Sequence, residues 1–137
     1  AELARSLGDP ARIICAGKKV GVITNNLAPQ LHVDIEAVMQ VCDNILSNAS
    51  RYARSRVTLS LWTEGDVLAV SVSDDGPGFA PEALAKAANP FYKGRESDSS
   101  HLGLGLNICD ILCRRHDGNL TFANSGAGAR ITARFGM

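Results

Sequence analysis

The chain has 137 residues, a length that suits one domain with a single hydrophobic core. Its 14 basic and 14 acidic residues cancel without long runs of one sign, so charge gives no argument for binding nucleic acid or an anionic membrane. No apolar stretch is long enough to cross a bilayer, and the four cysteines contain no CxxC pair, which favours buried reduced thiols over a disulfide framework or a zinc site.

The beginning of the chain predicts a short helix followed by a hairpin. Residues 2–7 have a helical pattern, and Asp9-Pro10 follows it. The β-rich runs Ala11–Cys15 and Val20–Thr24 flank Gly17-Lys18-Lys19, which favours two strands joined by a turn. Because the helical pattern is already present at the first residues, the chain is expected to be a fragment of a longer protein.

The stretch Asp34 to Ala53 predicts the central helix, with Asp34 as its amino-terminal cap. Its apolar face contains Ile35, Val38, Met39, Cys42, Ile45, Leu46, Ala49 and Ala53. The opposite side carries a polar stripe formed by Gln40, Asn44, Asn48 and Arg51. A solvated face is one interpretation of this stripe. Two amides and an arginine, without lysine or glutamate, suit metal and phosphate oxygens better.

The middle of the chain predicts two strands and a loop region. Residues 56–62 and 67–73 alternate apolar and polar side chains around a turn, which predicts an antiparallel pair. The second strand ends in Asp74-Asp75-Gly76-Pro77-Gly78-Phe79, which alone would indicate only a turn. A short helix is expected over 81–87. The polar segment 88–101 is either a surface loop or a mobile lid.

The last part of the chain predicts one more helix and a closing hairpin. Leu102-Gly103-Leu104-Gly105-Leu106 begins the helix, and its two glycines leave backbone N–H groups open to an anion. Strands over 120–124 and 130–135 then close the chain. This order of elements favours an α+β fold, a two-layer α/β sandwich with one mixed sheet backed by helices, over a doubly wound fold.

Four motifs follow one another along the chain: NILSNA, DDGPGF, PFYKG and HLGLGL. In this order they resemble the ATP-binding boxes of bacterial sensor histidine kinases and of the wider superfamily of gyrase, the heat-shock-90 chaperones and MutL. The resemblance runs from about residue 20 to the end and is most specific to the catalytic, ATP-binding domain of a two-component sensor histidine kinase. It implies a single Bergerat-type domain over 1–137, with a mostly antiparallel sheet, about three helices and a flexible ATP lid.

The resemblance implies roles for residues of the first two motifs. Asn48 looks like the residue that holds Mg²⁺, and Asn44, one turn earlier, would assist at the metal or at a phosphate. Arg51 would face the phosphates, and Tyr52 would pack near the adenine. Asp74 matches the carboxylate that accepts a hydrogen bond from the adenine amino group, which guanine cannot offer at that place.

The resemblance extends to the remaining motifs. Gly76 and Gly78 would let the backbone approach the base closely. Phe91 belongs to the phenylalanine box, and Lys93 could reach the γ-phosphate, so Lys93 and Asn44 are the residues expected to act in catalysis. The second glycine box, which would present N–H groups to the polyphosphate, comprises Leu102, Gly103, Leu104 and Gly105.

Two positions depart from the family pattern. His101 stands where the second glycine box often has glycine, which leaves open a looser lid, a contact between His101 and a phosphate, or a plain loop. Ala129 stands where the last glycine box often has threonine. Neither Ala129 nor the nearby Thr132 is expected to recognise the base.

Asn44 separates a kinase from a hydrolase. The gyrase-like and chaperone-like ATPases have a glutamate at this place that activates water, whereas an amide cannot take up a proton. The resemblance therefore favours Mg-ATP held for transfer of its γ-phosphate to a histidine on a separate helical phosphoacceptor domain of the same protein. None of the three histidines here lies in a phosphoacceptor box, so this piece is expected to bind ATP without phosphorylating itself.

The resemblance also implies partners and a location. The expected partners are ATP, the phosphoacceptor domain and a response regulator, with no nucleic acid. The isolated domain is expected to be a cytoplasmic monomer, and the full-length protein a homodimer anchored in the bacterial cell membrane. Two alternatives stay open: a gyrase- or MutL-type ATP hydrolase, and a related serine protein kinase or degenerate ATP-binding interaction module.

Overall fold

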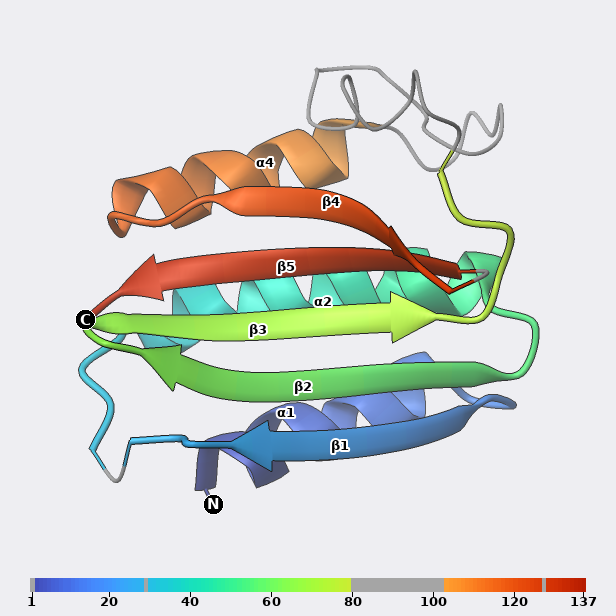
Figure 1. Ribbon diagram of the computed structural model, residues 1–137, viewed down its shortest axis with the longest axis horizontal. Helices are drawn as coiled ribbons and strands as arrows, with labels where there is room; N and C mark the ends of the chain where they lie inside the picture. Colours follow the sequence, from blue (N-terminus) through green and yellow to red (C-terminus); the bar gives the residue numbers. More distant parts are fainter. Residues whose placement is uncertain (1, 29, 80–102, 127) are drawn as a thin grey trace.

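The computed structural model describes residues 2–28, 30–79, 103–126 and 128–137 (Figure 1). In this part of the chain, three helices cover one face of a five-stranded sheet. The helices are α1 (Glu2–Ile14), α2 (Ile35–Tyr52) and α4 (Gly103–Arg115). The strands are β1 (Lys19–Asn25), β2 (Arg56–Glu64), β3 (Val67–Asp74), β4 (Leu120–Ser125) and β5 (Gly128–Gly136).

The sheet is mixed and mostly antiparallel. Its strand order is β1-β2-β3-β5-β4; β1 runs parallel to β2, and the other neighbouring strands are antiparallel. Buried side chains line up across the strands on the helix-covered face: Leu59 lies opposite Val72, and Val72 lies opposite Ile131. The two-layer α+β sandwich expected from the sequence is therefore confirmed, together with the β2–β3 pair and the closing β4–β5 hairpin.

The hairpin expected at the start of the chain is wrong. Ala11–Ile14 belongs to α1, which continues through Pro10, and β1 pairs with β2 instead of with the run before it. Leu3, Leu7 and Ala11 recur every four residues and are at most 7% exposed, so α1 buries a continuous apolar stripe. Burial of this stripe outweighs the missing N–H of the proline and the β-branched residues that favour a strand.

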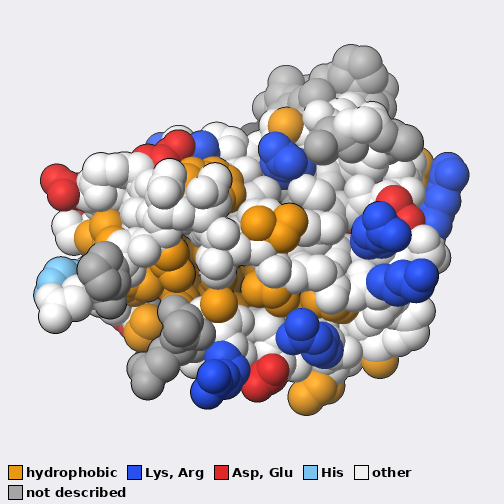
Figure 2. Space-filling view, turned by 60° about the horizontal axis from the view of Figure 1, so that its bottom comes forward, with side chains coloured by type: hydrophobic (Ala, Val, Ile, Leu, Met, Phe, Trp, Pro, Cys, Tyr) orange, Lys and Arg blue, Asp and Glu red, His pale blue; other side chains and the backbone are white. Residues whose placement is uncertain are grey.

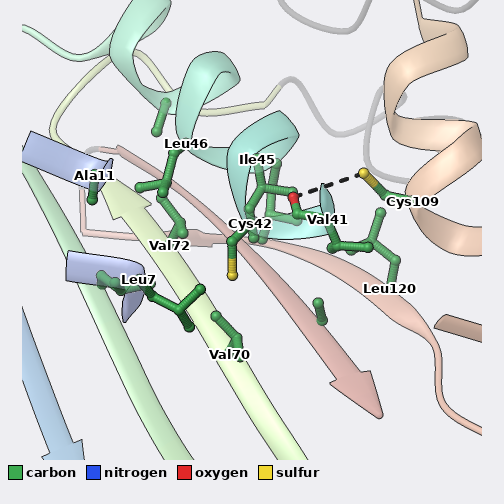
Figure 3. Close-up of a cluster of buried hydrophobic side chains, with 14 of the residues drawn as sticks. Leu7, Ala11, Val41, Cys42, Ile45, Leu46, Val70, Val72, Cys109 and Leu120 are labelled. Carbon is green, nitrogen blue, oxygen red and sulfur yellow. Dashed lines mark hydrogen bonds between the residues drawn. The ribbon is translucent and has the colours of Figure 1, made fainter. Parts of the chain in front are cut away.

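Helix α2 is the central element of the helical layer. As expected, Asp34 caps its amino end, where the carboxylate accepts the backbone N–H of Ala37 at 3.2 Å. Most of the predicted apolar face is buried against the sheet (Figure 3). Ile35 lies in the first turn and is 42% exposed, and Met39 is half-buried. Val41 is fully buried in addition, because α4 packs beside α2 and widens the buried face.

All four cysteines are buried free thiols, as the sequence predicts. The Cys109 thiol donates to the backbone carbonyl of Val41, with 3.9 Å between sulfur and oxygen, and so joins α4 to α2 (Figure 3). Burial raises the pKa of Cys109 and of Cys113 to about 12, which keeps both thiols protonated at neutral pH. These cysteines therefore serve as small apolar core residues between the two helices.

Hydrophobic side chains also remain on the surface near the β1 edge of the sheet. Ile23 of β1 is 53% exposed and Ile13 of α1 is 78% exposed. On the face shown in Figure 2, hydrophobic side chains form a broken band, and separate lysine and arginine side chains surround it. Within the described residues, no helix has both the length and the apolar character needed to cross a membrane.

The extent of α1 through residues 11–14 can be tested by truncating one buried and one exposed apolar side chain of this helix. Leu7 is 2% exposed, so Leu7→Ala should lower the free energy of unfolding by about 2–5 kcal/mol. Ile13→Ala, at the exposed position, should change it by no more than about 0.5 kcal/mol. Urea unfolding measures both values. Comparable losses for the two variants would contradict the helical assignment. In a strand over residues 11–15, Ile13 would share a face with the buried residues Ala11 and Cys15, so its truncation would also be costly.

Candidate functional site

Four segments that are distant in the sequence lie toward the same side of the molecule. They are the last turn of α2, the loop after β3, the first turn of α4 and the turn between β4 and β5 (right side of Figure 1). The structure thus brings together the predicted residues of the first two motifs and the start of the second glycine box. Phe91, Lys93, Leu102 and His101 lie outside the described residues, as do the expected helix over 81–87 and the expected lid.

The polar stripe of α2 is not an open solvated face. Gln40 is exposed, but Asn44, Asn48 and Arg51 are half-buried beside the surface that packs on α4. The side-chain nitrogen of Asn44 donates to the backbone carbonyl of Gln40 at 3.0 Å, which holds the amide along the helix. Asn44 also bonds with the thiol of Cys109 on α4. The contact with Cys109 places the Asn44 amide next to α4, the helix that begins with the glycine box.

Asp74 is the buried acid of the site. It ends β3, is 9% exposed, and its Oδ1 accepts the backbone N–H of Gly76 at 2.9 Å. The backbone N–H of Ala129, from the start of β5, lies 3.4 Å from the same oxygen. These two backbone donors fix the orientation of the carboxyl group. A buried carboxylate held in this way can select a ligand that offers an N–H group.

The glycines around Asp74 permit close backbone packing. A Cβ on Gly76 would overlap the carbonyl of Tyr52 at the end of α2, and a Cβ on Gly128 would overlap the carbonyl of Asp74. Gly78 has a positive φ of 77°, a conformation that favours glycine. The loop after β3 is therefore pressed between the end of α2 and the β4–β5 hairpin. Close packing against Tyr52 therefore requires glycine at position 76, independently of the predicted close approach of the base.

Asp75 is a structural residue of the site that the sequence did not reveal. Its Oδ1 accepts backbone N–H groups from Arg54 at 2.7 Å, Ser55 at 3.0 Å and Arg56 at 3.2 Å. Its Oδ2 accepts the Ser55 hydroxyl at 2.8 Å. The bonds from the Ser55 backbone and hydroxyl, followed by those from Arg56 and Arg54, hold the pKa of Asp75 well below its ordinary value. Asp75 thereby ties the α2–β2 connection to the end of β3.

Sequence signals for these additional contacts are weak. The adjacent Asp74 and Asp75 could be recognised as two acids after a strand, but nothing local distinguishes their partners, which lie about 20 and 55 residues away. The hydrogen bond that Ala129 makes with Asp74 comes from its backbone N–H. No group of three or more histidine, cysteine, aspartate or glutamate side chains within the described ranges is arranged to hold a metal ion.

Comparison with known proteins identifies related sequences. The family described as "Histidine kinase-, DNA gyrase B-, and HSP90-like ATPase" matches residues 33–137. The sensor histidine kinase CpxA of Escherichia coli strain K12 is 30% identical over 112 residues, which cover 77% of this chain and 24% of CpxA. The chain thus spans about a quarter of the length of this curated relative.

Solved structures share the fold. The mycobacterial sensor histidine kinase MprB superposes with a TM-score of 0.77 at 20% identity, over 98% of this chain and 93% of that one. Full-length ShkA in complex with AMPPNP gives a TM-score of 0.82 at 24% identity, over 98% of this chain and 29% of ShkA. The mixed sheet with its helices on one face is therefore the fold of histidine kinase catalytic domains.

The contacts of Asp75 predict an acid-dependent contribution to stability. Because its pKa is lowered on folding, the contribution is complete above the ordinary pKa of about 3.9 and is lost as the pH falls toward the lowered value. Between about pH 5 and pH 3, the free energy of unfolding of the wild type should therefore decrease more steeply than that of Asp75→Asn.

Urea unfolding at a series of pH values measures both slopes. Asp66→Asn is the matched control, because it removes the same charge from the exposed turn between β2 and β3. Its slope should follow that of the wild type. If Asp75→Asn also retained the wild-type slope, the carboxylate would not be the group that holds the α2–β2 connection.

Proposed function

The chain belongs to the family of histidine kinase-, DNA gyrase B- and HSP90-like ATPases, and from this premise we propose that it binds Mg-ATP and donates the γ-phosphate to a histidine on a separate phosphoacceptor domain. The whole protein would then be a sensor histidine kinase in two-component signalling. The relatives at 30% identity and above that support this proposal include CpxA, which is named a sensor histidine kinase.

Asp74 is proposed to recognise adenine. Its Oδ1 is occupied by the backbone N–H of Gly76 at 2.9 Å, and the side chain is largely buried, so its interaction with a ligand would be little weakened by water. A carboxylate accepts hydrogen bonds and donates none, which matches the exocyclic amino group of adenine and opposes the carbonyl of guanine. Tyr52, half-buried at the end of α2, stands next to this loop and is proposed to pack near the base.

Asn48 is proposed to hold Mg²⁺, with Asn44 assisting one turn earlier. Mg²⁺ keeps several waters and takes few protein oxygen ligands when phosphates supply the others, so a half-buried amide fits its preference. When bound, the metal would neutralise charge that develops on the phosphates. Arg51 on the same stripe, and the backbone N–H groups of Gly103 and Gly105 at the start of α4, are proposed to face the polyphosphate.

The observation that favours a kinase over a hydrolase is the amide at position 44. Asn44 donates to the carbonyl of Gln40 at 3.0 Å and cannot take a proton from water. Asp43 precedes it, and burial raises the pKa of its carboxyl group, but it lies about 100° around the helix on the exposed side. Without a base on the stripe, ATP would be kept for another nucleophile.

The proposed nucleophile belongs to another part of the full protein. His32 is exposed and precedes α2. His116 follows α4, and its Nε2 lies 3.8 Å from Oδ2 of Asp34, the cap of α2. Neither histidine therefore lies on the polar stripe of α2. The proposed partners are therefore a helical phosphoacceptor domain of the same protein and a response regulator. We propose a cytoplasmic location for this domain, within a homodimer anchored in the bacterial membrane.

Calorimetric titration with ATP and ADP, with and without Mg²⁺, tests nucleotide binding. Asp74→Asn should keep the bonds to Oδ1 but present an N–H group to the adenine amino group, so affinity for both nucleotides should fall at least about tenfold. Preference for ATP over GTP should disappear in the same variant. Asp66→Asn serves as the control for loss of one charge. Unchanged ATP affinity in Asp74→Asn would remove Asp74 from adenine recognition.

A transfer assay separates the kinase from a hydrolase. With a phosphoacceptor domain from the same gene neighbourhood, the chain should transfer label from γ-labelled ATP to an acid-labile phosphohistidine, and alone it should release little phosphate. Sustained phosphate release by the isolated domain would favour the gyrase-type hydrolase. Acid-stable phosphoserine would favour the related serine kinase, and binding without transfer would favour a degenerate module.

A further inference from the structure

Asn124, near the end of β4, makes a two-point contact with the backbone of Phe79. Its carbonyl oxygen accepts the N–H of Phe79 at 2.7 Å, and its side-chain nitrogen donates to the carbonyl of Phe79 at 2.8 Å. The two residues are 45 positions apart in the sequence. A primary amide can make this contact because it has both a donor and an acceptor, and the pair of bonds fixes Phe79 in position and in orientation.

The surroundings of Phe79 reinforce this contact. The Phe79 ring is 4% exposed and meets the ring of Phe122 edge to face, with centroids 5.9 Å apart. A Cβ on Gly78 would lie 2.9 Å from the Asn124 oxygen, so the loop and the amide are already in close contact. Strand β4 therefore supplies both an apolar and a polar anchor to the loop that follows β3.

The other end of the same loop is held by β5. Asp74 accepts the N–H of Gly76 and that of Ala129, and the backbone of Gly128 packs on the carbonyl of Asp74. The loop is thus fixed at its first residue by β5 and at its last by Asn124. The Asn124 amide thus adds a hydrogen-bonded anchor at Phe79 to the ring contact with Phe122 and to the bonds that Asp74 accepts at the start of the loop.

We propose that Asn124 is a positioning residue for nucleotide recognition. It holds the Gly76–Phe79 turn in the conformation that a bound adenine requires beside Asp74, and this role rests on the proposed function of Asp74. The position requires an amide. A carboxylate of the same shape would place an oxygen 2.8 Å from the Phe79 carbonyl oxygen, where two acceptors repel, unless the carboxyl group carries a proton that it can donate.

Asn124→Asp tests the proposal through pH. At about pH 8, where the new carboxyl group is ionised, the variant should bind ATP and ADP about tenfold more weakly than the wild type, with the same factor for both because the γ-phosphate is not involved. As the pH is lowered to about 5, protonation should restore the donor and reduce the difference from the wild type. Calorimetry with each nucleotide at each pH gives these ratios, and amide hydrogen exchange of Phe79 follows the anchor without nucleotide.

Ala123→Asp is the matched control, because it adds the same charge at the neighbouring exposed position of β4. It should bind nucleotide like the wild type at both pH values. Wild-type affinity of Asn124→Asp at pH 8, or a loss that is equal in Ala123→Asp, would overturn the proposal. A loss that persists at low pH while the wild type still binds would also overturn it.

A separate outcome identifies failure of the proposed function itself. If the folded wild type bound no nucleotide, Asp74 would have no adenine to recognise, whatever the exchange data showed. Exchange of the Phe79 amide that is faster in Asn124→Asp than in the wild type at pH 8, with a smaller difference between the two at pH 5, would still report the anchor in that case. If Asn124→Asp did not fold, Asn124→Ser, which adds no charge, should show the loss of affinity without the recovery at low pH.

Discussion

The site depends on two adjacent carboxylates whose side chains point to opposite sides of the chain. Side chains alternate along a strand, so Asp74 at the end of β3 is directed to the buried side, while Asp75 reaches the α2–β2 connection. Each accepts backbone N–H groups, Asp74 from Gly76 and Ala129, and Asp75 from residues 54–56. Asp75 thereby holds the connection between α2 and β2, and Asp74 holds the start of β5, next to the loop that follows β3.

This arrangement explains why glycines recur where the segments meet. Backbone N–H groups reach a carboxylate only if the chains approach closely, and Gly76 and Gly128 leave room for the carbonyls of Tyr52 and Asp74. The position of α2 is set independently, by burial of Val41, Ile45 and its other apolar residues against the sheet and α4. Helix α2 is thus held by apolar packing, whereas the loop after β3 is held next to it by hydrogen bonds.

The sequence predicted the parts of the fold in which periodicity is strong. The face of α2, the β2–β3 pair and the closing hairpin follow from patterns of period 3.6 or 2, and the order of four motifs identified the family, which the comparisons confirm. The first helix was missed because Pro10 and a β-branched run conceal a stripe whose burial decides the outcome. Asp75 and Asn124 were not foreseen because their partners lie far away in the sequence. The roles assigned to the site residues stay predictions, including those of Phe91, Lys93 and Leu102, which lie outside the described residues.

The replacement of threonine by Ala129 is compatible with an intact acid at the site. The contact that Ala129 makes with Asp74 uses its backbone N–H, which any residue other than proline supplies. What this contact requires is the course of the chain through Gly128, because a side chain there would displace the Asp74 carbonyl. Substitution at position 129 therefore removes a hydroxyl group without removing the donor that orients Asp74. Recognition by the acid depends on the geometry of the hairpin, to which Asn124 contributes a second, side-chain contact.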